Sequence, residues 1–124
     1  YMMYKKAKHF GDDVTAQKVL ETTNPRTQKQ LGREVKNYDD AEWLRVAYDY
    51  VVEGNRAKFQ QNSALSTELQ ATVGKVLVEA SPVDARWGIG MAADDPDIED
   101  ETKWRGQNLL GKALNQVRTE MFGT

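Results

Sequence analysis

The strongest constraint on the fold is a stripe of apolar residues in the middle of the chain. Its members Trp43, Ala47, Tyr50, Val51 and Gly54 recur at spacings of three and four, and Phe59 prolongs the stripe. This spacing is typical of one face of a helix. Asp39 or Asp40 can cap the start of that helix, so we predict one long helix that ends at about Gln61. The fold is therefore expected to be dominated by helices.

Caps and apolar spacing predict five shorter helices, over residues 1–10, 12–20, 25–35, 64–71 and 108–122. Gly11 stops the first helix, and Asp12 or Asp13 caps the second. Asn24 followed by Pro25 is a cap with proline at the first helical position. Ser63 can cap the helix over residues 64–71. The last helix has one apolar face.

A short β-branched segment, VLVE at residues 76–79, is the only convincing strand. The chain has 124 residues, 40% hydrophobic and 29% charged, which fits one compact domain. We therefore predict a single domain over residues 1–124 in the α+β class, predominantly helical, with one short strand and a long loop that contains glycine and tryptophan.

That long loop covers residues 80–105, which are rich in Pro, Gly, Asp and Trp and have no sustained period. Loops longer than roughly 12 to 15 residues in small domains are usually functional or disordered, and two tryptophans argue against disorder. The alternative is a packed surface loop in which Trp87 fills the core and Gly88 and Gly90 supply turns. For the acidic run at residues 94–101, a solvated face is the favoured interpretation.

Composition excludes several kinds of chemistry. The chain has no cysteine and a single histidine, His9, so disulfides, thiolate catalysis and clusters of Cys or His around a metal are excluded. The net charge of -2 gives no large sequence-independent attraction to nucleic acid or anionic lipid. No apolar run approaches the roughly 20 residues of a membrane helix. We expect a cytoplasmic protein that does not associate with membranes.

Carboxylates and lysines are the candidate reactive groups. Glu79 at the end of the predicted strand either projects into a cleft or pairs with Arg86. Asp84, Asp94, Asp95 and Asp97 compete with it for the role of base. Lys5, Lys6 and Lys8 cannot share one helix face, so we expect Lys6 to point inward and the other two to point toward water. A lysine among apolar groups can have a lowered pKa and form a Schiff base; the alternative is a solvated basic face.

The start of the last helix is a candidate anion site. Arg105 and Gln107 stand just before a helix whose first backbone amides are expected to be free, which suits a phosphate or an oxyanion. The alternative is an ordinary helix start in which Gly111 allows close packing.

Five segments carry a family resemblance over essentially the whole chain. They are YMMYKKAKHFGD, NPRTQKQLGREV, RAKFQQN, VEASPVDARWGIG and WRGQNLLGKAL, in this order. Their order and spacing resemble the YbiA/NADAR-like superfamily, and WGIG followed by WRGQNLLGKAL is a specific combination. The resemblance implies a helix-rich α+β fold and an N-glycosidase that needs no metal or cofactor. It also implies a short strand, a loop and a glutamate two positions ahead of Tyr1, which the printed sequence lacks.

The resemblance also implies a set of site residues. The predicted catalytic residues are Lys6, Glu79 and Asp84. The predicted substrate-binding residues are Trp43, Trp87, Gly88, Gly90, Trp104, Arg105, Gly106, Gln107 and Asn108. In this interpretation Lys6 contacts the sugar or forms a transient imine at its anomeric carbon. Glu79 or Asp84 acts as base or stabiliser, a tryptophan stacks on the base, and Arg105 with nearby amides holds the phosphate.

Three functions follow from the resemblance. The leading one is hydrolysis of ribosylamino-pyrimidine phosphates of riboflavin biosynthesis, which releases ribose 5-phosphate. The second is removal of ADP-ribose from guanine, with nucleic acid only as a modified substrate. The third is a module that binds ADP-ribose or NAD without cleaving it. The oligomeric state stays open.

Overall fold

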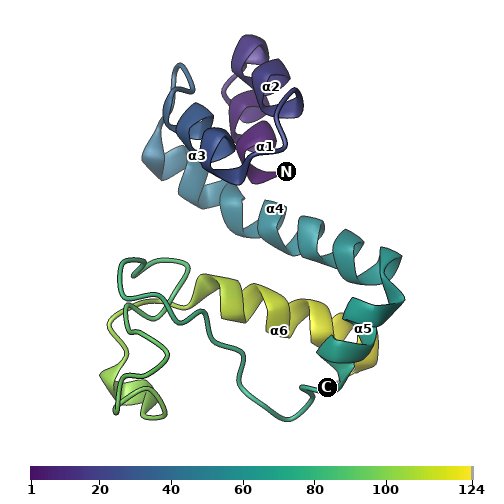
Figure 1. Ribbon diagram of the computed structural model, residues 1–124, viewed down its shortest axis with the longest axis vertical. Coiled ribbons are helices and arrows are strands. Elements are labelled where there is room, and N and C mark those ends of the chain that lie inside the picture. The colour runs from purple at the N-terminus through teal and green to yellow at the C-terminus, as the bar shows by residue number, and fades with distance from the viewer. Residues whose placement is uncertain (124) are drawn as a thin grey trace. The chain divides into compact units, whose positions relative to one another are not determined.

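The computed structural model describes residues 1–123. Its elements are α1 (Met2–His9), α2 (Asp13–Leu20), α3 (Pro25–Arg33), α4 (Asp40–Gln61), α5 (Ser63–Gln70), the 3-10 turn η1 (Glu101–Lys103) and α6 (Leu109–Phe122) (Figure 1). The chain divides into two compact units, Tyr1–Gly54 and Asn55–Thr124. None of the helices in residues 1–123 is both long and apolar enough to span a membrane.

The predicted α+β class is wrong, because residues 1–123 form helices, turns and irregular segments but no strand. The expected strand at 76–79 is an irregular segment whose hydrogen-bonding edge is occupied by a side chain. The Asn108 amide nitrogen donates to the Leu77 carbonyl at 2.9 Å, and its oxygen accepts from the Glu79 N–H at 3.0 Å. A side-chain amide thus takes the place of a partner strand, without which a strand is not formed.

Helix starts follow the predicted capping chemistry. The Asn24 side chain accepts from the backbone N–H groups of Arg26 and Thr27, with Pro25 in the first position of α3. The long helix has the predicted bounds. For α5, Asn62 rather than Ser63 is the cap, since its side-chain oxygen accepts from the Leu65 N–H at 3.2 Å.

In the first unit, α1, α2 and α3 pack against one another and lie side by side in Figure 1. Their core contains Ala7, Ala16 and Val35, with Tyr4 and Phe10 packed against it. The small alanines allow the short helices to approach closely. α1 is held in place by this packing, and it carries the lysines that the sequence singles out.

Asp12 fastens the turn between α1 and α2. Its carboxylate accepts from the N–H and the hydroxyl of Thr15, at 3.1 and 2.7 Å, and from the Lys36 N–H at 3.0 Å. These hydrogen bonds lower the pKa of Asp12 to about 2, with Thr15 the largest cause. One carboxylate therefore caps α2 and anchors the segment after α3.

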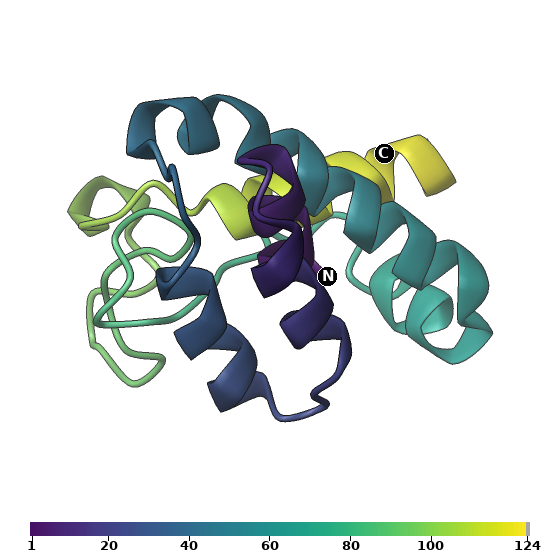
Figure 2. The same cartoon turned by 90° about the horizontal axis from the view of Figure 1, so that it is seen from above.

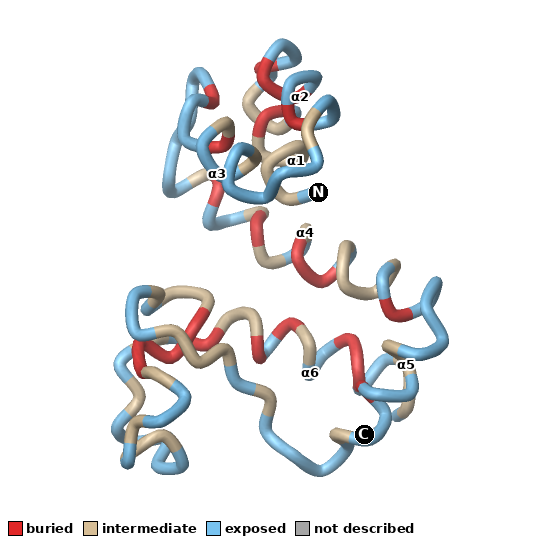
Figure 3. Tube along the Cα trace, viewed as in Figure 1, coloured by how far each residue is buried: buried red, intermediate tan, exposed pale blue. Residues whose placement is uncertain are grey.

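In the second unit, α5 and α6 are joined by a long irregular segment, residues 71–108, whose only regular element is η1. The predicted long loop is thus present. Figure 2 shows this segment folded back on itself near the start of α6, and Figure 3 shows buried residues where the two meet. Ile89 and Met91 are 0% and 1% exposed. The irregular segment therefore includes side chains that are fully buried.

Candidate functional site

Lys6 lies on α1 in a partly buried position. Its ammonium nitrogen is 4.3 Å from the centre of the Tyr38 ring. Burial lowers the pKa of Lys6, and the negative charge of Asp40 opposes that shift. Lys6 is therefore partly buried, and its placement in the apolar interior stays a prediction. A lowered pKa increases the fraction of the neutral amine, which is the nucleophilic form.

The two neighbouring lysines differ from each other. Lys8 is exposed and forms an ion pair with Asp13 at 2.8 Å, as expected of a lysine that points toward water. Lys5 does not point freely to water: its side chain is 30% exposed, its nitrogen is 3.8 Å from a Glu53 oxygen, and it lies over the rings of Tyr1 and Tyr50 at 5.5 Å. Lys8 is thus the better matched control for Lys6.

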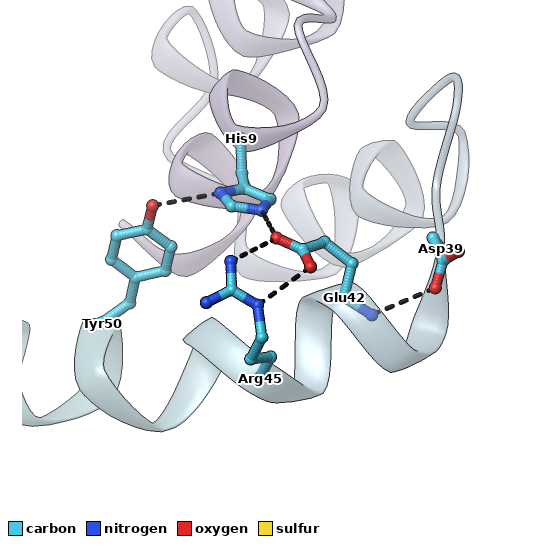
Figure 4. Close-up of polar contacts among 5 residues, drawn as sticks. All are labelled: His9, Asp39, Glu42, Arg45 and Tyr50. Carbon is cyan, nitrogen blue, oxygen red and sulfur yellow. Dashed lines mark hydrogen bonds and ion pairs between the residues drawn. The ribbon is translucent and has the colours of Figure 1, made fainter.

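A polar network centres on His9, which lies three positions after Lys6 on α1 (Figure 4). Its Nε2 is 3.0 Å from a Glu42 oxygen and its Nδ1 is 3.3 Å from the Tyr50 hydroxyl. Arg45 donates to both oxygens of Glu42, at 3.0 and 2.7 Å, and the Asp39 carboxylate accepts from the Glu42 N–H at 3.0 Å. Glu42 thus fixes the orientation of the imidazole, and hydrogen bonds with Arg45 and Asp39 fix the position of Glu42.

The ionisation of Glu42 determines where His9 carries a proton. Hydrogen bonds from Arg45 and then from His9 lower the pKa of Glu42 to about 2. An ionised carboxylate only accepts, so the His9 Nε2 carries a hydrogen. In neutral His9 the Nδ1 then accepts from the Tyr50 hydroxyl. His9 therefore joins the Glu42 carboxylate and the Tyr50 hydroxyl in one hydrogen-bonded chain.

Sequence reasoning missed this network, because it considered His9 only as a metal ligand. The available signal was spacing: Lys6 and His9 are three positions apart on α1 and therefore share a face. The partners Glu42 and Tyr50 come from α4, and no local pattern connects α4 to α1. His9 meets Glu42 and Tyr50 only through the tertiary packing of α1 against α4.

Trp43 is buried, with 7% of its surface exposed, and its ring lies 5.8 Å from that of Tyr50 and 6.4 Å from that of His9. Phe10 adds a ring 6.5 Å from Trp43. Trp43 therefore packs against the rings of His9 and Tyr50, two members of the network. Its predicted contact with substrate stays a prediction, for which little of the ring surface is available.

In the second unit, Asp84 organises the turn that contains WGIG. Its side-chain oxygen accepts from the N–H groups of Arg86 and Trp87, at 3.0 and 2.8 Å, while its carbonyl accepts from the Gly90 N–H at 3.2 Å. This is an Asx turn, in which the carboxylate replaces a backbone acceptor. A role of Asp84 as base stays a prediction, and one of its oxygens is already occupied.

The turn containing WGIG caps the start of α6. The N–H groups of residues 107, 108, 109 and 110 donate to the carbonyls of residues 85, 88, 86 and 87, at 2.8 to 3.2 Å. The expectation of free amides at this helix start is therefore wrong, because backbone carbonyls take them. Arg105 is exposed, and its own N–H donates to the Ile89 carbonyl at 2.9 Å. Phosphate binding by the Arg105 side chain stays a prediction.

The signature glycines allow close approach of the backbone. A Cβ atom at Gly88 would lie 2.8 Å from the Asp84 carbonyl oxygen, and one at Gly106 would lie 2.8 Å from the Ile89 carbonyl carbon. Any side chain there would separate the two segments. This packing explains both glycines without a ligand, so their contact with substrate stays a prediction, as does that of Gly90.

Three predicted site residues line one hollow of about 450 Å³, namely Asp84, Trp87 and Gln107. That volume is within the range of small-molecule sites. Glu79 is partly buried, and its carbonyl accepts from the Ile89 N–H at 3.0 Å. Trp104 is partly buried, and its indole N–H donates to the Ile98 carbonyl at 2.7 Å. Asn108 is buried, and its side-chain amide is hydrogen-bonded to the backbone of Leu77 and Glu79.

Comparison with known proteins identifies relatives of this chain. The NADAR domain model matches residues 1–122. N-glycosidase R617 of Acanthamoeba polyphaga mimivirus is 45% identical over 120 residues, which are 97% of this chain and 71% of the relative. Protein irg-1 of Caenorhabditis elegans is 41% identical over 124 residues, 98% of this chain and 58% of the relative.

A third relative is riboflavin biosynthesis protein VVA0006 of Vibrio vulnificus, 30% identical over 118 residues, which are 95% of this chain and 29% of the relative. The chain thus spans about seven-tenths, three-fifths and three-tenths of the three proteins. The family match covers nearly every residue and includes all the motifs on which the resemblance rests. The chain belongs to the NADAR domain family.

Proposed function

We propose that this chain is an N-glycosidase that hydrolyses ribosylamino-pyrimidine phosphates and releases ribose 5-phosphate. The observation that carries the proposal is the likeness of nearly the whole chain to a protein named N-glycosidase, at 45% identity. The name of the Vibrio vulnificus relative supports the substrate class. A cytoplasmic location belongs to the same proposal.

Lys6 supplies the nucleophile in this proposal. A ribosylamine opens to an iminium at C1, and the neutral Lys6 amine adds to that carbon. The pyrimidine amine then leaves with a proton, and an imine joins Lys6 to the sugar. Water adds to the imine carbon, the bond to Lys6 breaks, and ribose 5-phosphate is released. One water is consumed in total. Partial burial and the lowered pKa of Lys6 support this role.

His9 and Glu42 have a supporting role in the same proposal. Their geometry holds the imidazole on the same face of α1 as Lys6, and Glu42 stays ionised at neutral pH. An imidazole is a suitable general base for the proton that Lys6 loses on attack. Glu42 orients the ring for that transfer.

The test is incubation of the purified protein with a ribosylamino-pyrimidine phosphate in the presence of a chelator, with enzymatic detection of free ribose 5-phosphate. We expect release that Lys6→Ala abolishes and Lys8→Ala preserves. A parallel reaction contains ADP-ribosylated guanine. Release only from the second substrate would replace the proposed substrate class, and release from neither would leave a module that binds without cleaving.

A further inference from the structure

The second unit contains a pocket of about 490 Å³ to which the proposed reaction assigns no step, although its lining residues Trp104 and Asn108 are among the predicted substrate-binding residues. It lies along α6 and the segment at residues 74–77, and its lining includes Lys75, Leu77, Glu101, Trp104, Lys112 and Arg118. The volume is within the range of small-molecule sites. Trp104 and Leu77 give it an apolar wall, since the Trp104 indole N–H is already bonded to the Ile98 carbonyl.

A buried guanidinium forms part of the wall. Arg118 is only 4% exposed, and its terminal nitrogens donate to the carbonyl and hydroxyl of Thr72, at 2.6 and 3.0 Å, and to the side-chain oxygen of Asn115. Its Nε is buried and has no hydrogen-bond partner among the described residues. All of these acceptors are neutral. A buried charge with neutral partners lacks the opposite charge that normally offsets its lost hydration.

The other charged residues of the lining are mostly basic. Lys75 and Lys112 are exposed residues of the lining, and Glu101 is its single carboxylate. Three cations against one anion give the pocket a positive potential in a chain whose net charge is -2. Positive charge gathered in a concave site attracts small anions.

We propose that this pocket binds a small anion that carries a phosphate or carboxylate group. Lys75 and Lys112 contact the anion directly through their ammonium groups, and the fixed charge of Arg118 adds its field from the wall. Trp104 packs against an apolar part of the ligand. The proposal does not rest on the glycosidase reaction, because it concerns binding alone.

The experiment is a titration of the purified protein with inorganic phosphate and, separately, with acetate, at constant ionic strength. Binding is followed by calorimetry and by the NMR signal of the Trp104 indole, which Trp104→Phe identifies. We expect Lys112→Ala and Lys75→Ala each to raise the Kd roughly three- to tenfold. The control Lys29→Ala removes an exposed charge on α3 and is expected to leave the Kd unchanged.

Both lysines are exposed, so both variants are expected to melt at the wild-type temperature. Binding of phosphate but not acetate assigns the site to phosphates, and the reverse assigns it to carboxylates. The proposal is overturned if neither probe binds the wild-type protein, if the Trp104 signal does not shift, or if Lys112→Ala and Lys75→Ala bind as tightly as Lys29→Ala.

Discussion

Replacement of Asn108 by alanine tests the bridge that holds the start of α6 to residues 77–79. Asn108 is 5% exposed and adopts a left-handed backbone conformation with φ of 53°. Its side chain makes both a donor bond to Leu77 and an acceptor bond from Glu79, at 2.9 and 3.0 Å. Alanine removes both bonds and tolerates the left-handed conformation poorly.

The expected cost adds three contributions. Leaving a buried donor or acceptor without a partner costs about 1 to 3 kcal/mol. We take about 1 kcal/mol for each lost hydrogen bond, because water reaches the partly buried backbone groups. The left-handed conformation costs alanine about 1 kcal/mol more than asparagine. Asn108→Ala is therefore expected to lower the free energy of unfolding by about 3 kcal/mol. Asn108→Gly loses both bonds without the conformational cost, so we expect about 2 kcal/mol.

Urea unfolding followed by far-UV circular dichroism and by tryptophan fluorescence measures these values. The matched control is Asn62→Ala, which removes one exposed cap bond to the Leu65 N–H and is expected to cost about 1 kcal/mol. If Asn108→Ala costs no more than Asn62→Ala, the bridge does not hold the loop, and our explanation for the missing strand fails.

Three further predictions concern the first unit. Asp12→Asn should lower the melting temperature at pH 7. The deficit should vanish as the pH falls from the unfolded pKa near 3.8 to the folded pKa of about 2, because a carboxylate with a lowered pKa stabilises only while it is ionised; melts across this pH range measure it. Gly32→Ala should change the melting temperature little, since a new Cβ would displace the flexible Met3 side chain while alanine favours the helix by about 1 kcal/mol; in a Met3→Ala background the same substitution should raise it. Lys6→Ala should abolish release of ribose 5-phosphate while Lys8→Ala retains it, as initial rates will show.

The helices were predictable because their signals are local. Asn24 with Pro25, and the apolar stripe that begins at Trp43, each lie within one element and need no partner to be interpreted. The cap of α5 was misplaced by one position, because Asn62 and Ser63 are both good caps and only the structure chooses between them.

The strand was not predictable in the same way, because its formation depends on a partner far along the chain. Val76 and Val78 have the residue type of a strand, yet Asn108, about thirty positions later, occupies the edge that pairing would need. A β-branched segment indicates only an extended backbone when no second strand is available to pair with it.

The candidate site was predictable to the extent that it depends on spacing along one helix. Helical periodicity predicts that Lys6 is less exposed than Lys8, and the structure has Lys6 partly buried and Lys8 exposed. The network of His9 with Glu42 depends on contacts between distant segments. So do the hydrogen bonds that the N–H groups at the start of α6 donate to the carbonyls of residues 85–88. Such contacts leave no local pattern, so they were missed.

Borohydride trapping tests the central claim most directly. The protein is mixed with a ribosylamino-pyrimidine phosphate, sodium borohydride is added during turnover, and the digested chain is analysed by mass spectrometry. An imine at Lys6 predicts a reduced ribosyl phosphate adduct on the peptide that contains this residue, absent from Lys6→Ala and present in Lys8→Ala. Steady release of ribose 5-phosphate by Lys6→Ala, or an adduct on another lysine with none on Lys6, would contradict the assignment.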